Sequence, residues 1–271
     1  MSDPTSAETL IVIGASSAIA RAFINQAVVD QGQEVPLSII SISRQSALTL
    51  AEHPANIVHH HFSCDYQQAS IIECVNNISL VAGKVTRVVM CNGILHSKTP
   101  LSPTEQPKNS NLMPEKRIED INSDALQQLF YANSIVPMLW LSALTALLSQ
   151  ANYNVAADKK CVISILSARV GSISDNRLGG WYGYRASKAA LNMLIKTTAV
   201  EYARRLKRVK LIAFHPGTTD TPLSKPFQAN VPAGKLFTPE FVASQLTAIM
   251  AEIQPNGEAS YLDWQGKEIS W

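Results

Sequence analysis

Tyr184 and Lys188 are the two residues whose types and spacing most clearly allow acid–base chemistry. On a helix, four-residue spacing stacks the phenol above the ammonium group, and no other tyrosine has a lysine four residues later. A fixed cation favours the phenolate, so it lowers the pKa of a phenol from its ordinary value of about 10. Such a pair also arises by chance on a solvated helix face. Its meaning therefore depends on the elements that position it.

The composition restricts the class of protein. A chain of 271 residues, 46% hydrophobic and 16% charged, is long enough for one substantial core, and we expect a single domain over residues 1–271. A net charge of +2 without a long run of Lys or Arg gives no electrostatic case for nucleic acid or a membrane surface. The N-terminal sequence does not resemble a secretion signal, and the four cysteines lack the spacing of a zinc site or disulfide framework. We expect buried thiols in a cytoplasmic protein.

Short apolar runs rich in Val and Ile alternate with longer segments of helical period. Such strands are typical of a parallel sheet covered on both faces, and the alternation predicts right-handed βαβ units. We therefore expect an α/β fold, a Rossmann-like doubly wound parallel sheet of about seven strands with helices on both faces. The predicted strands are Thr9–Ile13, Leu37–Ser43, Ile57–Phe62, Val85–Cys91, Lys160–Leu166, Val209–Phe214 and Ala259–Leu262, and the predicted helices are Ala18–Asp30, Gln67–Val81, Ser123–Gln150, Tyr182–Arg205 and Pro239–Ile253.

Two proline-rich segments, Ser97–Arg117 and Pro216–Thr238, interrupt this alternation. Each follows the carboxyl end of a predicted strand, where a doubly wound sheet binds its ligand. Long loops in a compact domain are usually functional lids or disordered segments. We interpret residues 216–238 as a substrate lid and leave both alternatives open for residues 97–117.

The first strand runs into Gly14-Ala15-Ser16-Ser17-Ala18-Ile19-Ala20 and then a helix. A strand, a tight turn and a helix N-terminus together form an anion site, because unpaired backbone N–H groups and the helix dipole favour a phosphate. A dinucleotide-binding loop ordinarily has glycine at the positions of Ala18 and Ala20. The loop is still usable if both alanines keep a negative φ, although an ordinary strand-to-helix turn is the alternative.

These features occur in one order together with several others. The set is the loop at Gly14, Cys91-Asn92-Gly93, Asn133, Ser167, Tyr184-x-x-x-Lys188 and Pro216-Gly217-Thr218-Thr219-Asp220-Thr221. In order and approximate interval it resembles the short-chain dehydrogenase/reductase family over nearly the whole chain. The stretch from Ser167 to Trp181 is similar to the branch that contains C-factor-like proteins and sniffer-type carbonyl reductases.

The resemblance implies a role for each catalytic candidate. Tyr184 would exchange a proton with the oxygen of a carbonyl or alcohol, while the nicotinamide gives or takes hydride. Lys188 would hold the nicotinamide ribose and lower the pKa of Tyr184. Ser167 would hydrogen-bond the substrate oxygen, or merely cap its strand. Asn133 would tie a water relay to Lys188, or merely face solvent.

The resemblance also implies the cofactor-binding residues, which are Gly14, Ser16, Ser17, Ala18, Ile19, Asn92, Gly93, Pro216, Thr219 and Thr221. Turn chemistry is the alternative role of Thr219 and Thr221. No Asp or Glu occurs from Val35 to Ala51 to bind an NAD ribose, so we expect NADP(H), with NAD(H) possible. Ser43 and Arg44 would hold the 2′-phosphate, unless Arg44 is a solvated cation. Asp65 would contact adenine or cap the helix after it.

The remaining features concern the substrate and partners. Leu95, Ile173, Trp181, Tyr182 and residues 222–237 are expected to line an apolar pocket for a hydrophobic carbonyl or alcohol. Adjacent strand residues face opposite sides, so only two of His59, His60 and His61 share a face and we expect no metal site. We expect an NADP(H)-dependent carbonyl reductase or alcohol dehydrogenase. The resemblance implies a homodimer or homotetramer paired through the long central helices, unless the Ser97–Arg117 insertion covers that surface. The alternative is a C-factor-like signalling or regulatory protein that senses a dinucleotide with little or no turnover.

Overall fold

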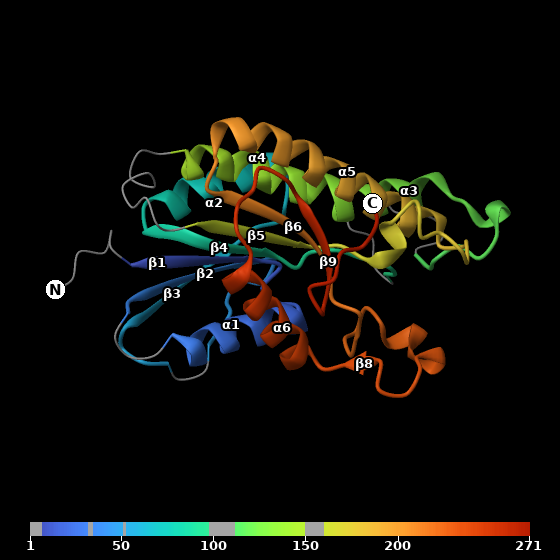
Figure 1. Ribbon diagram of the computed structural model, residues 1–271, viewed down its shortest axis with the longest axis horizontal. Helices are drawn as coiled ribbons and strands as arrows, with labels where there is room; N and C mark the ends of the chain where they lie inside the picture. The colour runs from blue at the N-terminus through green and yellow to red at the C-terminus, as the bar shows by residue number, and fades with distance from the viewer. Residues whose placement is uncertain (1–6, 32–34, 51–52, 98–111, 150–159) are drawn as a thin grey trace.

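The computed structural model describes residues 7–31, 35–50, 53–97, 112–149 and 160–271. Seven parallel strands form one sheet in the order β3-β2-β1-β4-β5-β6-β9 (Figure 1). Their bounds are β1 Glu8–Ile13, β2 Leu37–Ser43, β3 Ile57–Ser63, β4 Lys84–Met90, β5 Cys161–Leu166, β6 Val209–His215 and β9 Ser260–Asp263. The predicted doubly wound sheet is confirmed.

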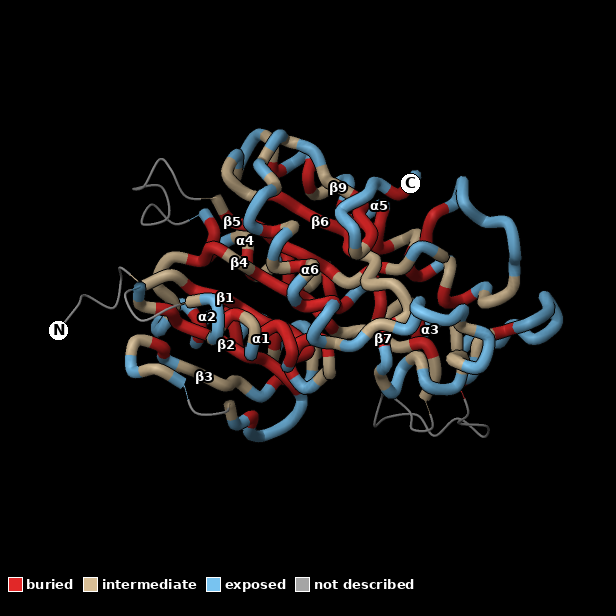
Figure 2. Tube along the Cα trace, turned by 60° about the horizontal axis from the view of Figure 1, so that its bottom comes forward, coloured by how far each residue is buried: buried red, intermediate tan, exposed pale blue. Residues whose placement is uncertain are grey.

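Helices cover both faces of the sheet, and the sheet separates the core into two layers (Figures 1 and 2). On one face lie α2 (Gln68–Ser79), α4 (Val136–Leu148) and α5 (Tyr182–Arg205), and on the other lie α1 (Ala18–Asp30) and α6 (Pro239–Glu252). The strands alternate apolar side chains between these layers, so both faces of β1 and β2 are buried. This burial on both faces explains their nearly continuous apolar sequence.

The predicted helix Ser123–Gln150 is interrupted by a wider turn. Helix α3 (Ser123–Phe130) passes into a π-helical turn, Tyr131–Ile135, before α4 begins. Single π turns add one residue to a helix and often occur at functional sites. The expectation of regular helix was therefore wrong at this turn, and it is the turn that carries Asn133.

The stretch Ser123–Leu148 is long and apolar enough to cross a membrane by length and composition alone. Half of its most apolar window is buried inside the protein, where α4 packs against α2 and contributes to the core. The helix is therefore a core element of this fold and gives little support for a membrane span.

Both proline-rich segments lie past the carboxyl ends of strands. Residues 98–111 of the first lie outside the described residues, and Ser97 and Leu112 form an antiparallel bridge at its base. The second segment folds into β7 (Thr218–Thr219), which pairs with β8 (Leu236–Phe237), and a 3-10 helix, Lys225–Asn230, between them. The segment is thus folded into short regular elements beside the end of the sheet. Its role as a substrate lid stays a prediction.

Candidate active site

Tyr184 and Lys188 lie in the first two turns of α5, and both are buried. The Lys188 Nζ lies 5.9 Å from the centroid of the Tyr184 ring and donates a hydrogen bond of 2.8 Å to the Leu166 carbonyl. The four-residue spacing therefore stacks the two side chains as predicted. The Leu166 carbonyl, at the end of β5, holds the ammonium group of Lys188 through this hydrogen bond.

Burial changes the pKa values of both groups. It raises the pKa of the Tyr184 phenol, with the nearby Tyr261 adding to the effect, and it lowers the pKa of Lys188 to about 7. The expectation that Lys188 lowers the pKa of Tyr184 is wrong for this state of the protein. Loss of hydration is the main cause for both groups, and the Lys188 ammonium donates to a neutral carbonyl.

The start of α5 is held by Glu115, from the first proline-rich segment. Trp181 occupies the N-cap position with φ +53° and has no side chain that accepts from the helix. Instead, its N–H donates to the Glu115 carbonyl at 2.6 Å, and both carboxylate oxygens of Glu115 accept from the Gly183 N–H at 3.3 and 3.2 Å. A Cβ on Gly183 would lie 2.8 Å from this carboxylate. Sequence reasoning missed Glu115, because no local pattern signals a cap supplied 68 residues away.

Ser167 directly follows β5 and is buried. Its N–H continues the ladder to the Phe214 carbonyl at 2.7 Å, and its Oγ lies 2.6 Å from Asn192 Oδ1. The hydroxyl is thus held by a neighbouring helix and does not cap its own strand. Sequence reasoning missed Asn192, although its spacing of four residues from Lys188 places it on the same helix face.

Asn133 connects the π turn to the end of β4. Its Oδ1 accepts from the Ile94 N–H at 2.8 Å, and its Nδ2 donates to the Ile94 carbonyl at 2.9 Å and to Ser187 Oγ at 3.0 Å. The side chain is fully buried, so the solvent-facing alternative is wrong. A Cβ on Gly93 would lie 3.2 Å from Asn133 Oδ1 and 3.5 Å from Lys188 Nζ, which places these two polar groups around the same backbone.

Three catalytic candidates, Ser167, Tyr184 and Lys188, line one cavity of about 620 Å³ at the carboxyl ends of the strands. The same cavity is lined by the predicted cofactor residues Ser16, Ser17, Ala18, Ile19, Asn92, Gly93, Pro216, Thr219 and Thr221. A smaller cavity of about 170 Å³ shares Ser16, Ser17, Asn92 and Gly93 with it and adds Gly14, Arg44 and Asp65. Together they cross the point where the strand order reverses between β1 and β4, which is the usual ligand site of such sheets.

The sequence matches the short chain dehydrogenase family over residues 8–232, which is most of the chain. The chain belongs to this family. The resemblance found in the sequence is confirmed, and membership makes the protein an oxidoreductase with a Rossmann-like fold.

Two curated relatives illustrate the range of the family. The chain is 29% identical to the C-signal of Myxococcus xanthus over 152 residues, which are 56% of this chain and 82% of that one. It is 26% identical to a benzil reductase ((S)-benzoin forming) of Bacillus cereus, over 89% of this chain and 95% of that one.

Two solved structures share the fold. The NADPH-bound carbonyl reductase from chicken fatty liver has a TM-score of 0.77 and 20% identity, with 98% of this chain and 94% of that chain covered. The carbonyl reductase Sniffer of D. melanogaster has a TM-score of 0.74 and 18% identity, with 98% and 100% covered. The C-signal relative and the Sniffer fold agree with the branch indicated by residues 167–181.

The dinucleotide-binding loop of this short-chain dehydrogenase needs glycine at only one position. Gly14 has φ +76°, and a Cβ there would lie 2.7 Å from the Asn92 backbone nitrogen. Ala18 and Ala20 belong to α1 and do not adopt a positive φ, so the condition set from the sequence is met. Ser17 caps the helix, since its Oγ accepts from the Ala20 N–H at 3.2 Å. The loop retains the backbone donors of a phosphate site.

The 2′-phosphate prediction is only half supported by the geometry. Ser43 is fully buried, its Oγ accepts from the Gln45 N–H at 3.1 Å, and it lines neither cavity, so its contact with the 2′-phosphate has no support from the geometry and stays a prediction. Arg44, the next residue, faces the opposite way, is exposed and lines the smaller cavity. Arg21 lines the larger cavity and was missed, because a polar residue on an amphipathic helix gives no distinguishing signal.

Asp65 accepts a local backbone hydrogen bond and lines the smaller cavity. Its Oδ1 accepts from the Gln67 N–H at 2.8 Å, and this bond lowers the pKa of the carboxyl group. The bond closes a turn just before α2, whose N-cap residue Gln67 has no side-chain cap, so Asp65 does not cap the helix. Asp65 also lines the smaller cavity, and its contact with adenine stays a prediction.

Aromatic side chains form the wall of the larger cavity beside Tyr184. The Trp181 and Phe227 ring centroids lie 5.0 Å apart, and those of Trp181 and Tyr184 lie 6.2 Å apart. Leu95 also lines the cavity as predicted. Two other predicted lining residues do not, because Ile173 is 76% exposed and Tyr182 points outward from the start of α5.

The histidine run lies on β3 at the edge of the sheet. His59 Nε2 and His61 Nδ1 both contact Ser41 Oγ, at 2.7 and 2.9 Å, so these two histidines share a face as predicted. Within the described residues, no group of three or more His, Cys, Asp or Glu side chains is arranged to hold a metal ion. Both histidine rings instead have Ser41 on β2 as a hydrogen-bond partner.

Proposed function

We propose that this short-chain dehydrogenase is an NADP(H)-dependent oxidoreductase that interconverts a carbonyl and an alcohol, with Tyr184 as general acid and base. The observation that carries the proposal is that Ser167, Tyr184 and Lys188 line a single cavity with the loop that begins at Gly14. The dinucleotide supplies the hydride when it is bound. The chain supplies the proton, the orientation of the substrate and the exclusion of water.

Each side chain has one task in this mechanism. Burial keeps the Tyr184 phenol protonated near neutral pH, which suits donation to a carbonyl oxygen. Ser167 lies at the same cavity wall and hydrogen-bonds the substrate oxygen. Lys188 reaches the nicotinamide ribose hydroxyls from the end of β5, and Asn133 holds the Ile94 backbone beside it.

The decisive test is Tyr184→Phe, which removes the phenolic oxygen and keeps the ring against Trp181. We expect turnover to fall at least about 100-fold, because general acid–base groups contribute factors of this size, while NADPH affinity measured by fluorescence stays within about twofold. Tyr182→Phe is the matched control, since Tyr182 does not line the cavity. Full activity of Tyr184→Phe would refute the mechanism.

NADP(H) is the favoured cofactor, and NAD(H) remains possible. Support comes from the exposed Arg44 at the smaller cavity, from the absence of an acidic residue between Val35 and Ala51, and from the NADPH that the chicken carbonyl reductase structure contains. Titration of the protein with both dinucleotides measures this preference directly.

The substrate class we propose is a hydrophobic carbonyl compound or its alcohol. The aromatic wall formed by Trp181 and Phe227 supports it, as does the benzil reductase relative, whose name states an aromatic diketone substrate. Benzil, aromatic aldehydes, ketones and quinones form the panel with which NADPH oxidation is screened.

The second candidate is a dinucleotide sensor with little or no turnover, favoured by the similarity to the C-signal of Myxococcus xanthus. NADPH binding without oxidation across the whole panel would support this candidate over the enzyme. A substrate that is turned over in a Tyr184-dependent manner would exclude it.

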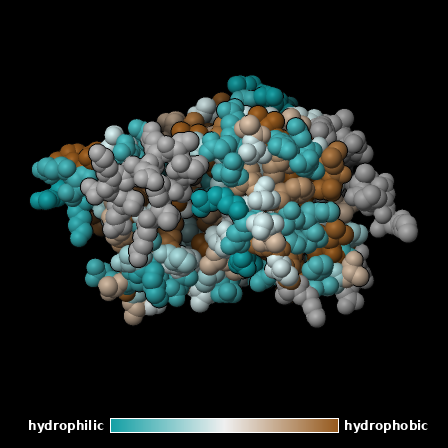
Figure 3. Space-filling view, turned by 180° about the vertical axis from the view of Figure 1, so that it is seen from behind, coloured by the Kyte–Doolittle hydropathy of each residue, from teal (hydrophilic) through white to brown (hydrophobic). Residues whose placement is uncertain are grey.

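Residues 1–271 are proposed to act as one domain in the cytoplasm, which agrees with four buried, unpaired cysteines. Homodimer or homotetramer formation through α4 and α5 stays a prediction. Apolar side chains of α5 are exposed, namely Met193 and Val200, whereas the back face in Figure 3 mixes hydrophilic and hydrophobic residues. Light scattering after size exclusion measures the oligomeric state.

A further inference from the structure

The hydroxyl of Ser167 has a partner that constrains where its hydrogen points. Asn192 presents Oδ1 at 2.6 Å from Ser167 Oγ and Nδ2 at 3.3 Å from the Gly171 carbonyl. A backbone carbonyl only accepts hydrogen bonds, so the amide nitrogen of Asn192 must face Gly171. The amide oxygen therefore faces Ser167, which has to donate its single hydrogen to it.

A serine hydroxyl has one hydrogen and two lone pairs. With the hydrogen given to Asn192, Ser167 presents lone pairs to the cavity. Asn192 is itself buried in the middle of α5, where asparagine has poor helix propensity. It follows Tyr184 and Lys188 at four-residue intervals, so the three side chains lie along one helix face.

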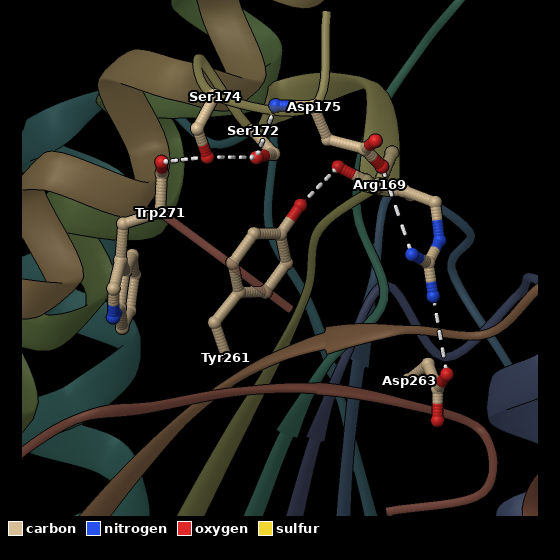
Figure 4. A network of polar contacts seen from close by, with 8 residues as sticks. Arg169, Ser172, Ser174, Asp175, Tyr261, Asp263 and Trp271 are labelled. Carbon is tan, nitrogen blue, oxygen red and sulfur yellow. Dashed lines mark hydrogen bonds and ion pairs between the residues drawn. The ribbon is translucent and has the colours of Figure 1, made fainter. Parts of the chain in front are cut away.

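Tyr261, on β9, holds the same stretch from the other side. Its hydroxyl donates to the Ala168 carbonyl at 2.6 Å (Figure 4), and burial raises its pKa to about 12, although the nearby polar side chains of Asn192 and Ser167 act in the opposite direction. Its ring is almost completely buried. Ser167 is thus enclosed between α5 and the C-terminal strand.

The residues after Ser167 are tied to the C-terminal part of the chain as well (Figure 4). Arg169 donates to Asp263 at 3.1 Å and lies 3.6 Å from Asp175, and Ser174 Oγ donates to the Trp271 carbonyl at 3.0 Å. These contacts restrain the backbone that carries Gly171, whose carbonyl sets the orientation of the Asn192 amide.

We propose that Asn192 is a positioning residue that fixes the place and hydrogen-bond direction of the Ser167 hydroxyl. The proposal rests on the proposed function, because it assigns Ser167 to the substrate oxygen. Without substrate, this bond holds Ser167 Oγ in one place at the cavity. When the substrate binds, the hydroxyl turns its hydrogen from Asn192 to the substrate oxygen while Oγ keeps its position, which is the role that the proposed function assigns to Ser167. A buried amide oxygen left without a donor is costly, so Asn192 returns the hydroxyl to one position after each turnover.

The experiment compares Asn192→Leu, which has similar volume and no polar atom, with Asn192→Asp, which keeps an acceptor facing Ser167. Both are made in the full chain with Ser167 and with Ser167→Ala, and Asn25→Leu on the exposed face of α1 is the control. We expect Asn192→Leu to lower kcat about tenfold, the worth of one hydrogen bond, with unchanged NADPH affinity. Asn192→Asp recovers part of the loss, and Asn192→Leu has no further effect with Ser167→Ala.

Equal losses from Asn192→Leu in both backgrounds would overturn the proposal, because a merely structural role does not depend on Ser167. Crystal structures of the wild type and Asn192→Leu give a readout that needs no turnover, and we expect Ser167 Oγ to leave its position. If Asn192→Leu does not fold, Asn192→Ser replaces it in each arm. A wild type without turnover refutes the proposed function, whereas an unmoved Ser167 Oγ refutes the positioning role.

Discussion

The two ends of the proposed active site differ in the groups that form them. At the catalytic end, Ser167, Tyr184 and Lys188 are buried side chains, and Ser167 and Lys188 are each held by a hydrogen-bond partner from another element. At the dinucleotide end, the site consists of backbone around Gly14 and of an exposed cation, Arg44. A substitution at the first end removes a functional atom. At the second end it acts only by moving the backbone or changing the charge.

The largest expected effect concerns pH, because buried titratable groups are prominent at the catalytic end. His215, at the carboxyl end of β6, is held neutral by burial, which lowers its pKa from 6.5 to about 4. Between these two pH values, the His215 side chain binds more protons in the unfolded chain than in the folded one. Its contribution to the free energy of unfolding is therefore fully present above about pH 6.5 and is lost as the pH falls toward 4. The loss from this group reaches about 3.5 kcal/mol at most, since one pKa unit corresponds to about 1.4 kcal/mol.

Urea unfolding of the wild type and of His215→Asn from pH 4 to 8 measures this dependence. We expect the free energy of unfolding of His215→Asn to change much less with pH than that of the wild type. His59 on β3, whose pKa burial also lowers to about 4, provides the comparison, and His59→Asn should remove less because that ring is less deeply buried. An acid dependence that His215→Asn leaves untouched would place the sensitivity outside the catalytic end.

A backbone substitution gives the next largest effect, at the dinucleotide end. Gly14→Ala should weaken NADPH binding about 100-fold, because the new Cβ lies 2.7 Å from the Asn92 backbone nitrogen and forces the loop to move. Gly234→Ala is a matched control, since Gly234 has a similar φ of +74° and no atom within 4 Å of such a Cβ. Equal affinities in the two variants would mean that φ strain alone, and not the fit of the loop, matters.

The smallest of the three effects concerns the charge at that end. Arg44→Ala should weaken NADPH binding about tenfold and leave NADH binding unchanged, because only the former carries the 2′-phosphate. Lys207→Ala, an exposed cation next to the start of β6, is the control. A parallel loss for both dinucleotides would show that Arg44 contributes general attraction without recognising the phosphate.

The sheet and its helices were predicted from the sequence because the signals are local. Val- and Ile-rich runs separated by helical periods specify the alternation, and every predicted strand lies within a residue or two of an observed one. Helix bounds were equally close except at Tyr131–Ile135, where the turn is π-helical. Asn133, in that turn, forms hydrogen bonds with Ile94, which is 39 residues away in the sequence, so no local pattern could predict them.

The residues of the proposed site could be recognised in the sequence where residue identity carries the chemistry, and their supporting partners were missed where it does not. Tyr184 and Lys188 are recognisable because few residue pairs provide a phenol over an ammonium. The burial of Ser43 and the exposure of Ile173 were not foreseen, because a strand end and a loop do not reveal which way a side chain points. Glu115 was overlooked for the reason that its partner, the start of α5, is distant in the sequence.

The amino-acid sequence by itself determined the family, the alternation of strands and helices and the choice of the groups proposed to react, because these depend on residue type and local spacing. Tertiary structure decided the electrostatics. Burial of Tyr184 and Lys188 shifts their pKa values in the directions opposite to those that a solvated pair would show. It also decided that Glu115 and Asn192, from a loop and from the third turn of α5, hold the catalytic helix and Ser167, because hydration and long-range contacts exist only in the folded chain.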